Sequence, residues 1–312
     1  MVLRDADIYF QPDATDPVLA DDLVLSLVRR HVPAARAVTG IDETGGEARV
    51  YEIDDDVIFK TQRPHRARDR TSLKKEVFFL GQLASDAEVS VPKVLGYGRE
   101  SEHIEYTCMT RMPGVTLRSV DCEGETRRQV FRAVGQMLRR IHSLPQQPFV
   151  ENELLPGDRA AGDVRRRFEA LYANAVRSIG EQDGSWPLRE TPEALAQRVL
   201  AAFPESDDRV ALHSNPTAVH IFVDGESCAF EGLIDFGDAY ISHPAFDLRQ
   251  RGAFADRADV LKGYTADEPV SDQFMATWRA VMVLTTMTAI PALRPEHRGA
   301  AEQTLRDLLN AI

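Results

Sequence analysis

Polar side chains of the kinds that bind cations and phosphates flank two short apolar runs in the segment 212–248. Asn215 and His220 precede the first run, and Asp235 follows the second. An Asp-Gly pair at 224–225 separates the runs; because both residues tolerate positive φ, it predicts a tight reversal and a two-stranded hairpin. A hairpin of this length returns Asp235 to the neighbourhood of Asn215 and His220. The converging carboxylate, amide and imidazole suit a divalent cation held on phosphate oxygens beside an incoming hydroxyl.

This segment resembles the aminoglycoside phosphotransferase family, small-molecule kinases that are built like protein kinases. The family pattern is His-Gly-Asp, four residues, Asn, a short apolar strand and Ile-Asp-Phe-Gly-Asp. This chain has His213-Ser214-Asn215, then Pro216 to Val219, His220, and later Ile234-Asp235-Phe236-Gly237-Asp238. His220 replaces the metal-binding Asn, as in the branch that phosphorylates the 2″-hydroxyl of aminoglycosides, and Asn215 replaces the catalytic Asp.

The resemblance implies a nucleotide site that takes ATP or GTP together with Mg²⁺. Asp235 would be one metal ligand through its hard oxygens, and His220 would be the second, directly or through water. Asn215 would occupy the catalytic position and orient the acceptor hydroxyl, although an amide does not take a proton at neutral pH. Asp238 is one candidate for the missing base, and a carboxylate from the segment 151–208 is another.

Lys60 and Glu76 are charged residues at positions that should face the protein interior. Lys60 ends a predicted strand on the same side as Ile58, and Glu76 lies on the apolar face of a predicted helix. Burying an unpaired ammonium is costly, so an inward lysine needs a partner, and Glu76 supplies one. In the kinase template such a pair holds the α- and β-phosphates of ATP. The alternative is a surface lysine with a boundary glutamate.

Two further stretches match parts of the family's nucleotide site. Gly45 and Gly46 lie in a loop between strands, where backbone N–H groups can approach phosphates without side-chain obstruction. A plain loop is nevertheless the commoner meaning of such a pair. Thr110 and Met112 belong to the stretch 109–114, which resembles the hinge whose backbone binds the edge of adenine.

Three polar residues near these motifs are expected to be structural. His142 ends the stretch 138–142, which resembles the family's helix end that packs beneath the catalytic loop. His213 should be a buried, hydrogen-bonded residue. Asp247 matches a family aspartate that would tie the loop around His213 in place through backbone hydrogen bonds.

Short strands with acidic turns come first along the chain, and helices follow. The predicted strands are Arg49–Ile53, Val57–Lys60, Val91–Leu95 and Tyr106–Met109. The predicted helices are Asp21–Val32, Leu73–Leu83, Glu125–His142, Ala161–Ile179, Pro192–Phe203, Asp256–Gly263, Ser271–Ile290 and Glu296–Ile312. This order predicts an α+β, bilobal protein-kinase-like fold, with a small antiparallel-sheet N-lobe at 1–111 and a larger, mainly helical C-lobe at 112–312.

The chain has 312 residues, a net charge of −12, 43% hydrophobic residues and 28% charged residues, which are ordinary values for a soluble protein with a sizeable core. The negative charge argues against nucleic acid or an anionic membrane as a partner. It suits a small hydroxylated substrate that is cationic, such as an aminoglycoside or another amino sugar, although solubility alone explains an acidic balance as often. Asp158, Asp163 and Glu169 are the carboxylates that the helical part offers to such a substrate.

The cysteines and the N-terminus bear on the cellular compartment. Cys108, Cys122 and Cys228 are widely spaced and lack metal-ligand spacing, which favours a reduced compartment. The first ten residues lack the basic start and apolar centre of a signal peptide, and the longest apolar run, at 281–290, is too short to cross a bilayer. We therefore expect a cytoplasmic protein, either a monomer or a dimer.

Two functions remain open on the sequence alone, and Asn215 divides them. The first is an active ATP-dependent kinase of a small hydroxylated molecule. The second is a catalytically impaired relative that binds nucleotide or a small ligand without efficient transfer. General-base catalysis contributes roughly 10²–10⁴-fold, whereas phosphoryl transfer depends mostly on positioning and charge neutralisation. Loss of the base therefore predicts a slow enzyme.

Overall fold

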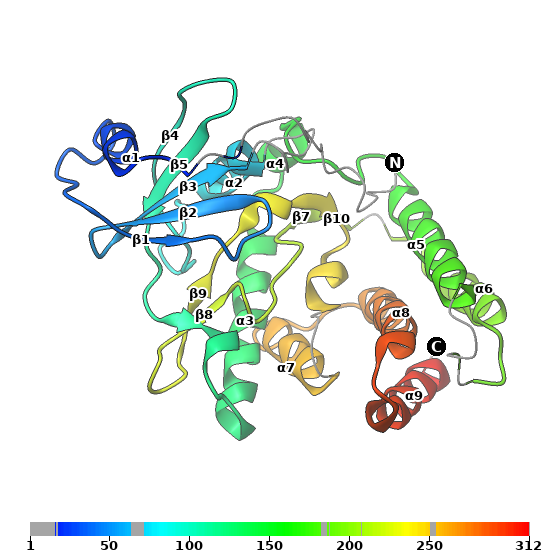
Figure 1. Ribbon diagram of the computed structural model, residues 1–312. Coiled ribbons are helices and arrows are strands. Elements are labelled where there is room, and N and C mark those ends of the chain that lie inside the picture. The colour runs from blue at the N-terminus through cyan, green and yellow to red at the C-terminus, as the bar shows by residue number, and fades with distance from the viewer. Residues whose placement is uncertain are drawn as a thin grey trace.

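The computed structural model describes residues 16, 18–63, 72–181, 186, 188–206, 208–249 and 254–311. These residues form the predicted α+β, bilobal, kinase-like fold, in which a small antiparallel sheet adjoins a larger, mainly helical body (Figure 1). None of the helices in these ranges is long and apolar enough to cross a membrane.

The sheet has five antiparallel strands in the order β1-β2-β3-β5-β4, so β3 is central. The strands are β1 (Val38–Asp42), β2 (Ala48–Ile53), β3 (Val57–Gln62), β4 (Val94–Arg99) and β5 (Glu105–Thr110), and the helices beside them are α1 (Asp21–Val28) and α2 (Ser72–Leu83). The sequence did not predict β1, because this edge strand is largely exposed and lacks an apolar alternation. β4 begins three residues later than predicted, since Pro92 has no N–H to give to a ladder.

All of the helices that the sequence predicted for the body are present, with ends that differ by a few residues. They are α3 (Gly124–Ser143), α5 (Asp163–Gly180), α6 (Pro192–Ala202), α7 (Phe254–Tyr264), α8 (Asp272–Ala289) and α9 (Pro295–Asn310), joined by a short α4 (Gln147–Glu151). Ile312, the predicted end of the last helix, lies outside the described residues. Short strands and 3₁₀ turns complete the body: β6 (Val115–Thr116), η2 (Leu117–Ser119), β7 (Val210–Leu212), β8 (Ile221–Val223), β9 (Phe230–Leu233), η3 (Phe236–Asp238), β10 (Tyr240–Ser242), η4 (Pro244–Arg249) and η5 (Ile290–Ala292).

The β8–β9 hairpin exists as predicted, but the tight Asp-Gly reversal was wrong. The connection spans the six residues 224–229, and the residue with positive φ is Cys228, at 56°. The N–H of Cys228 donates to the carbonyl of Asp224, while the carboxylate of Asp224 accepts from Ser227. The wider turn arises because the Asp224 side chain caps the loop, which a two-residue turn would not permit.

Two clusters of buried apolar residues hold the molecule together. The smaller cluster joins α1 to the sheet and includes Tyr51 and Phe59. The larger cluster fills the helical body, and α2 contributes Phe79 and Leu83 to it. The division of the chain after residue 111 stays a prediction, because α2 precedes that point yet packs into the larger cluster.

Helices α3 and α7 pack at backbone contact through two glycines. A Cβ atom on Gly135 would lie 2.0 Å from the carbonyl oxygen of Val260, and one on Gly263 would lie 1.9 Å from that of Arg132. Neither obstacle is a flexible side chain, so a larger residue at either position must separate the two helices.

We therefore expect Gly135→Ala to lower the free energy of unfolding by about 1–3 kcal/mol through overpacking. Gly299→Ala is the matched control, because Gly299 lies in α9 with no atom within 4 Å of an added Cβ. There the gain in helix propensity should raise stability by about 0.5–1 kcal/mol. Urea denaturation of both variants measures the difference, and equal effects would show that α3 and α7 are not in backbone contact.

Candidate functional site

A buried lysine links three segments of the chain at the junction of sheet and body. Lys60 Nζ on β3 lies 2.9 Å from Oε2 of Glu76 on α2 and 3.0 Å from Oδ1 of Asp235, which follows β9. The Lys60 side chain is 15% exposed and that of Glu76 is 2% exposed. The inward lysine and glutamate that the sequence predicted are therefore partners, and Asp235 joins them.

The three charges control one another's protonation. Burial alone would lower the pKa of Lys60, but Asp235 and Glu76 outweigh it and raise that pKa above its ordinary value. Burial would raise the pKa of Asp235, but Lys60 and then His220 bring it below its ordinary value. Burial raises the pKa of Glu76 despite the attraction of Lys60. An ammonium on Lys60 and an ionised carboxylate on Asp235 follow from this balance.

His220 lies between the loop that holds Asn215 and the carboxylate of Asp235. Its Nδ1 is 2.7 Å from the carbonyl oxygen of Asn215, and its Nε2 is 3.2 Å from Oδ2 of Asp235. A carbonyl accepts, so Nδ1 carries a hydrogen and donates to it, while Nε2 faces a carboxylate oxygen. Either a proton on Nε2 or a cation shared between the two atoms would satisfy this approach.

Asp235 and His220 are the residues that could hold a magnesium ion. Asp235 would supply a hard oxygen and His220 a second ligand. No group of three or more His, Cys, Asp or Glu side chains suited to a metal occurs among the described residues.

The backbone around His213 is fixed by one buried carboxylate. Asp247 accepts from the N–H of His213 at 2.7 Å and from the N–H of Ser214 at 2.6 Å, and Nε2 of His142 lies 3.1 Å from it. His213 is fully buried; its Nε2 donates to the carbonyl of Ile234, and burial lowers its pKa. The structural roles expected for Asp247, His142 and His213 agree with these contacts.

Asn215 stabilises its loop through hydrogen bonds of its backbone. Its carbonyl accepts from the N–H of Thr217 at 2.8 Å as well as from His220, whereas its side-chain amide makes no hydrogen bond within the described part of the chain. Asp238 lies on η3, three residues after Asp235, and is half-buried. The predicted catalytic amide and the candidate base therefore lie on two different loops, one before β8 and one after β9.

Two backbone N–H groups of the predicted hinge donate to residues of neighbouring segments. The N–H of Thr110 donates to the carbonyl of Lys93, and that of Arg111 donates to the carbonyl of Asp56. The N–H of Met112 makes no hydrogen bond to any residue that the structure describes. Met112 as a residue is buried, with 7% of its surface exposed.

Gly45 and Gly46 lie in the exposed loop between β1 and β2. Val50, three residues after that loop, is the cross-strand partner of Lys60. The loop thus begins close to the lysine, and the side chain of Gln62 holds it by donating to the carbonyl of Glu47.

Two of the three carboxylates that the sequence offered to a substrate, those of Asp158 and Asp163, are instead bonded within the protein. Asp158 is buried and bonded to Nε of Arg167 and to the hydroxyl of Ser242. Asp163 accepts from the backbone N–H groups of 159 and 160 at the start of α5. Glu169 stays half exposed beside an arginine of the same helix. Neither Asp158 nor Asp163 is therefore free to meet a substrate.

Sequence reasoning missed Ser90, which bonds β9 close to Asp235. Its hydroxyl donates to the carbonyl of Glu231, and its own carbonyl accepts from the N–H of Leu233. A single serine between α2 and β4 carries no local signal for such a contact.

A sequence model described as the phosphotransferase enzyme family matches residues 38–299. No curated protein matches the chain.

Three solved structures illustrate the similarity in fold. The GDP complex of wild-type aminoglycoside 2'-phosphotransferase-IIIa is 14% identical, with 94% of this chain and 99% of that chain covered and a TM-score of 0.65. The streptomycin-ATP ternary complex of APH(2")-IIa is 15% identical, with 90% and 93% covered and a TM-score of 0.58. The apoenzyme of macrolide 2'-phosphotransferase MphH from Brachybacterium faecium is 18% identical, with 91% and 97% covered and a TM-score of 0.54.

The site geometry generates a prediction for Ser214, which has a φ of 80° where the family pattern has glycine. A left-handed conformation costs a residue with a Cβ atom about 1–2 kcal/mol, so Ser214→Gly should raise the free energy of unfolding by about 1 kcal/mol. Ser214→Ala keeps the Cβ atom and should give no such gain. Thermal and urea denaturation check both variants; a gain in Ser214→Ala would place the cost in the hydroxyl instead of the backbone.

Proposed function

The chain belongs to the phosphotransferase enzyme family, and from this membership we propose that it transfers the γ-phosphoryl group of ATP or GTP to a hydroxyl of a small molecule. The observation that carries the proposal is the contact of Lys60 with both Glu76 and Asp235. A buried ammonium held by two carboxylates at the junction of sheet and body is poorly explained by stability alone, since apolar residues of the same volume would serve as well. It is well explained as a phosphate-binding group.

Each charged residue of the site would have a separate role in binding the phosphates. Lys60 would contact the α- and β-phosphates, and Glu76 would keep its ammonium in place. Asp235 and His220 would hold Mg²⁺, which when bound neutralises charge on the phosphates. Because Lys60 and Asp235 touch each other at 3.0 Å, the nucleotide would insert between groups that are already ionised and aligned.

The backbone would hold the rest of the nucleotide. The N–H of Met112, which has no partner among the described residues, and the carbonyl of Thr110 suit the hydrogen-bonding edge of a purine, which offers an acceptor beside a donor. Amide groups of Gly45 and Gly46 would approach the phosphates from the β1–β2 loop. In this assignment residues 1–111 form the nucleotide lobe, and residues 112–312 supply the catalytic loop and the substrate side.

Asn215 would orient the acceptor hydroxyl through its amide oxygen. The hydroxyl proton needs another acceptor, and Asp238 is the candidate because it follows the metal ligand by three residues on η3. Transfer would be slow without a base at 215 but would persist, because the loose transition state depends mainly on alignment and charge.

The acceptor is proposed to be a hydroxylated amine such as an amino sugar. Solved structures of similar fold include an aminoglycoside 2'-phosphotransferase, a macrolide 2'-phosphotransferase and a streptomycin-ATP complex of APH(2")-IIa. The net charge of −12 favours a cation over an anion. Cytoplasmic location follows as part of the same proposal, because ATP and GTP are supplied there.

A second candidate is a protein that binds nucleotide without efficient transfer. The specific observation in its favour is Asn215, since the side chain at the family's catalytic position accepts no proton. Both candidates require nucleotide binding, and only the first requires turnover.

Nucleotide binding is tested by thermal denaturation with ATP and Mg²⁺. We expect a rise in melting temperature that corresponds to about 2–4 kcal/mol at ligand concentrations of 100–1,000 times Kd. Lys60→Ala should abolish the rise, measured from its own baseline, because the phosphates lose their cation. Lys74→Ala, which changes an exposed lysine on α2, should keep it. If the parent protein shows no shift at millimolar ATP or GTP and none by calorimetry, both candidate functions fail.

Turnover is tested by restoring the usual residue. Asn215→Asp should raise the rate of phosphoryl transfer by ~10²-fold or more, because a proton acceptor of the same shape replaces the amide. The rate is measured as phosphorylated product from a panel of amino sugars, nucleosides and amino alcohols.

Asp238→Asn separates the remaining possibilities. If Asn215→Asp changes nothing and Asp238→Asn removes activity, the base has moved to Asp238. If no variant transfers phosphate although all bind ATP, the nucleotide-binding protein is the correct description.

A further inference from the structure

Strand β9 pairs with β8 along one edge, and on its other edge its backbone forms hydrogen bonds with Ser90. The pairing of β8 with β9 is irregular and leaves Glu231 as an extra residue beside Gly232. The hydroxyl of Ser90 donates to the carbonyl of Glu231, and the carbonyl of Ser90 accepts from the N–H of Leu233 at 3.1 Å. Ser90 therefore satisfies the bulged residue and fixes the backbone on both sides of Gly232.

Gly232 has no room for a side chain. A Cβ atom there would lie 2.3 Å from Cε of Met112 and 2.5 Å from the carbonyl oxygen of Ser90. The methionine methyl group can move aside, but the Ser90 carbonyl is bonded to β9 itself. The glycine thus lets Met112 and Ser90 approach β9 from the same side.

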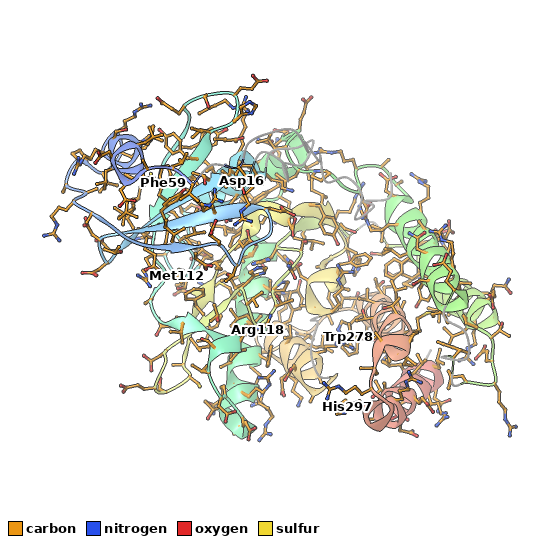
Figure 2. All side chains as sticks on the ribbon, viewed as in Figure 1. Asp16, Phe59, Met112, Arg118, Trp278 and His297 are labelled. Atoms are coloured by element: carbon orange, nitrogen blue, oxygen red, sulfur yellow. The ribbon has the colours of Figure 1, made fainter. Side chains whose placement is uncertain are left out.

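Met112 lies where the chain leaves the sheet for the helical body, beneath the five-stranded sheet in Figure 2. Its side chain touches Gly232, and the residue is 7% exposed. Two residues later, Gly114 has a φ of 79° and packs against the carbonyl of Val223 on β8. The crossing segment is therefore attached to the β8–β9 hairpin at two points.

We propose that Ser90 and Gly232 form a seat for the Met112 side chain that sets the position of the Met112 N–H. The inference rests on the proposed function, because it concerns how the same site holds the nucleotide base. Ser90 and Gly232 are positioning residues: Gly232 touches Met112, and Ser90 fixes the backbone of β9 on both sides of Gly232. Asp235 follows Gly232 by three residues, so one short stretch of β9 aligns the base end of the site with its phosphate end.

Binding of the base and binding of the phosphates can be measured separately, with adenosine and with tripolyphosphate. Gly232→Ala should raise the Kd of ATP and of adenosine about tenfold or more, because a displaced Met112 moves its N–H away from the base. The Kd of tripolyphosphate with Mg²⁺ should stay within about twofold, because Lys60 and Asp235 are untouched. Calorimetry and nuclear magnetic resonance titration measure all three probes on the full chain.

Gly225→Ala is the matched control in the same hairpin. An added Cβ on Gly225 meets nothing closer than a methyl group of Val115 at 3.7 Å, so all three Kd values should match those of the parent. If Gly232→Ala also matches the parent, the seat does not exist. If Gly232→Ala weakens tripolyphosphate as much as adenosine, the residue acts on Asp235 and the seat is again overturned.

Ser90→Ala keeps the proposal testable if Gly232→Ala does not fold. It removes the hydroxyl that supports Glu231 and keeps the backbone bond to Leu233, so adenosine should weaken about threefold with tripolyphosphate unchanged. An unchanged adenosine Kd in Ser90→Ala would contradict the seat. If the parent itself binds neither ATP nor GTP, the proposed function fails first, and that outcome is distinct from a parent that binds and variants that bind equally.

Discussion

The buried ammonium of Lys60 is the interaction on which the rest of the site depends. An unpaired charge in this position would cost several kcal/mol, and the structure meets that cost with carboxylates from two other segments. Glu76 brings α2 against the sheet, and Asp235 brings the end of β9 to the same point. Glu76 also accepts from the backbone N–H of Phe236, so the helix is tied to the residue directly after Asp235. The sheet, α2 and the hairpin are thus held in one arrangement by a single cation.

The same arrangement keeps two residues in left-handed backbone conformations. Asp235 has a φ of 68° and Ser214 a φ of 80°, although both carry a Cβ atom. Such conformations persist where surrounding contacts determine them more than once. Asp235 is held by Lys60 and His220, and Ser214 is held through its N–H by Asp247. Asp54 and Cys228 also have a positive φ, but they lie in turns between strands, whereas Asp235 and Ser214 lie in the two loops next to His220.

The sequence predicted those parts of the site whose chemistry is visible residue by residue. An inward lysine and an inward glutamate each call for a partner, and a hairpin must return Asp235 to His220. It did not predict that Lys60 contacts Asp235, because 175 residues separate them and no local pattern records the meeting of two lobes. The turn at 224–229 was wrong for the opposite reason. There a short Asp-Gly signal was outweighed by the hydrogen bonds that Asp224 makes within a longer loop.

The loop around Asn215 explains how its amide can stand at the family's catalytic position without disturbing the fold. Two acceptors shape the loop through hydrogen bonds. The carbonyl of Asn215 accepts from Thr217 and His220. The carboxylate of Asp247 accepts from the N–H groups of His213 and Ser214. The side chain at 215 takes no part in them. An aspartate or an asparagine at 215 is therefore compatible with the hydrogen bonds that shape this loop. Under the proposed function the backbone of the loop and the side chain that would face the acceptor hydroxyl are different atoms, so the loop can be kept while the residue at 215 changes.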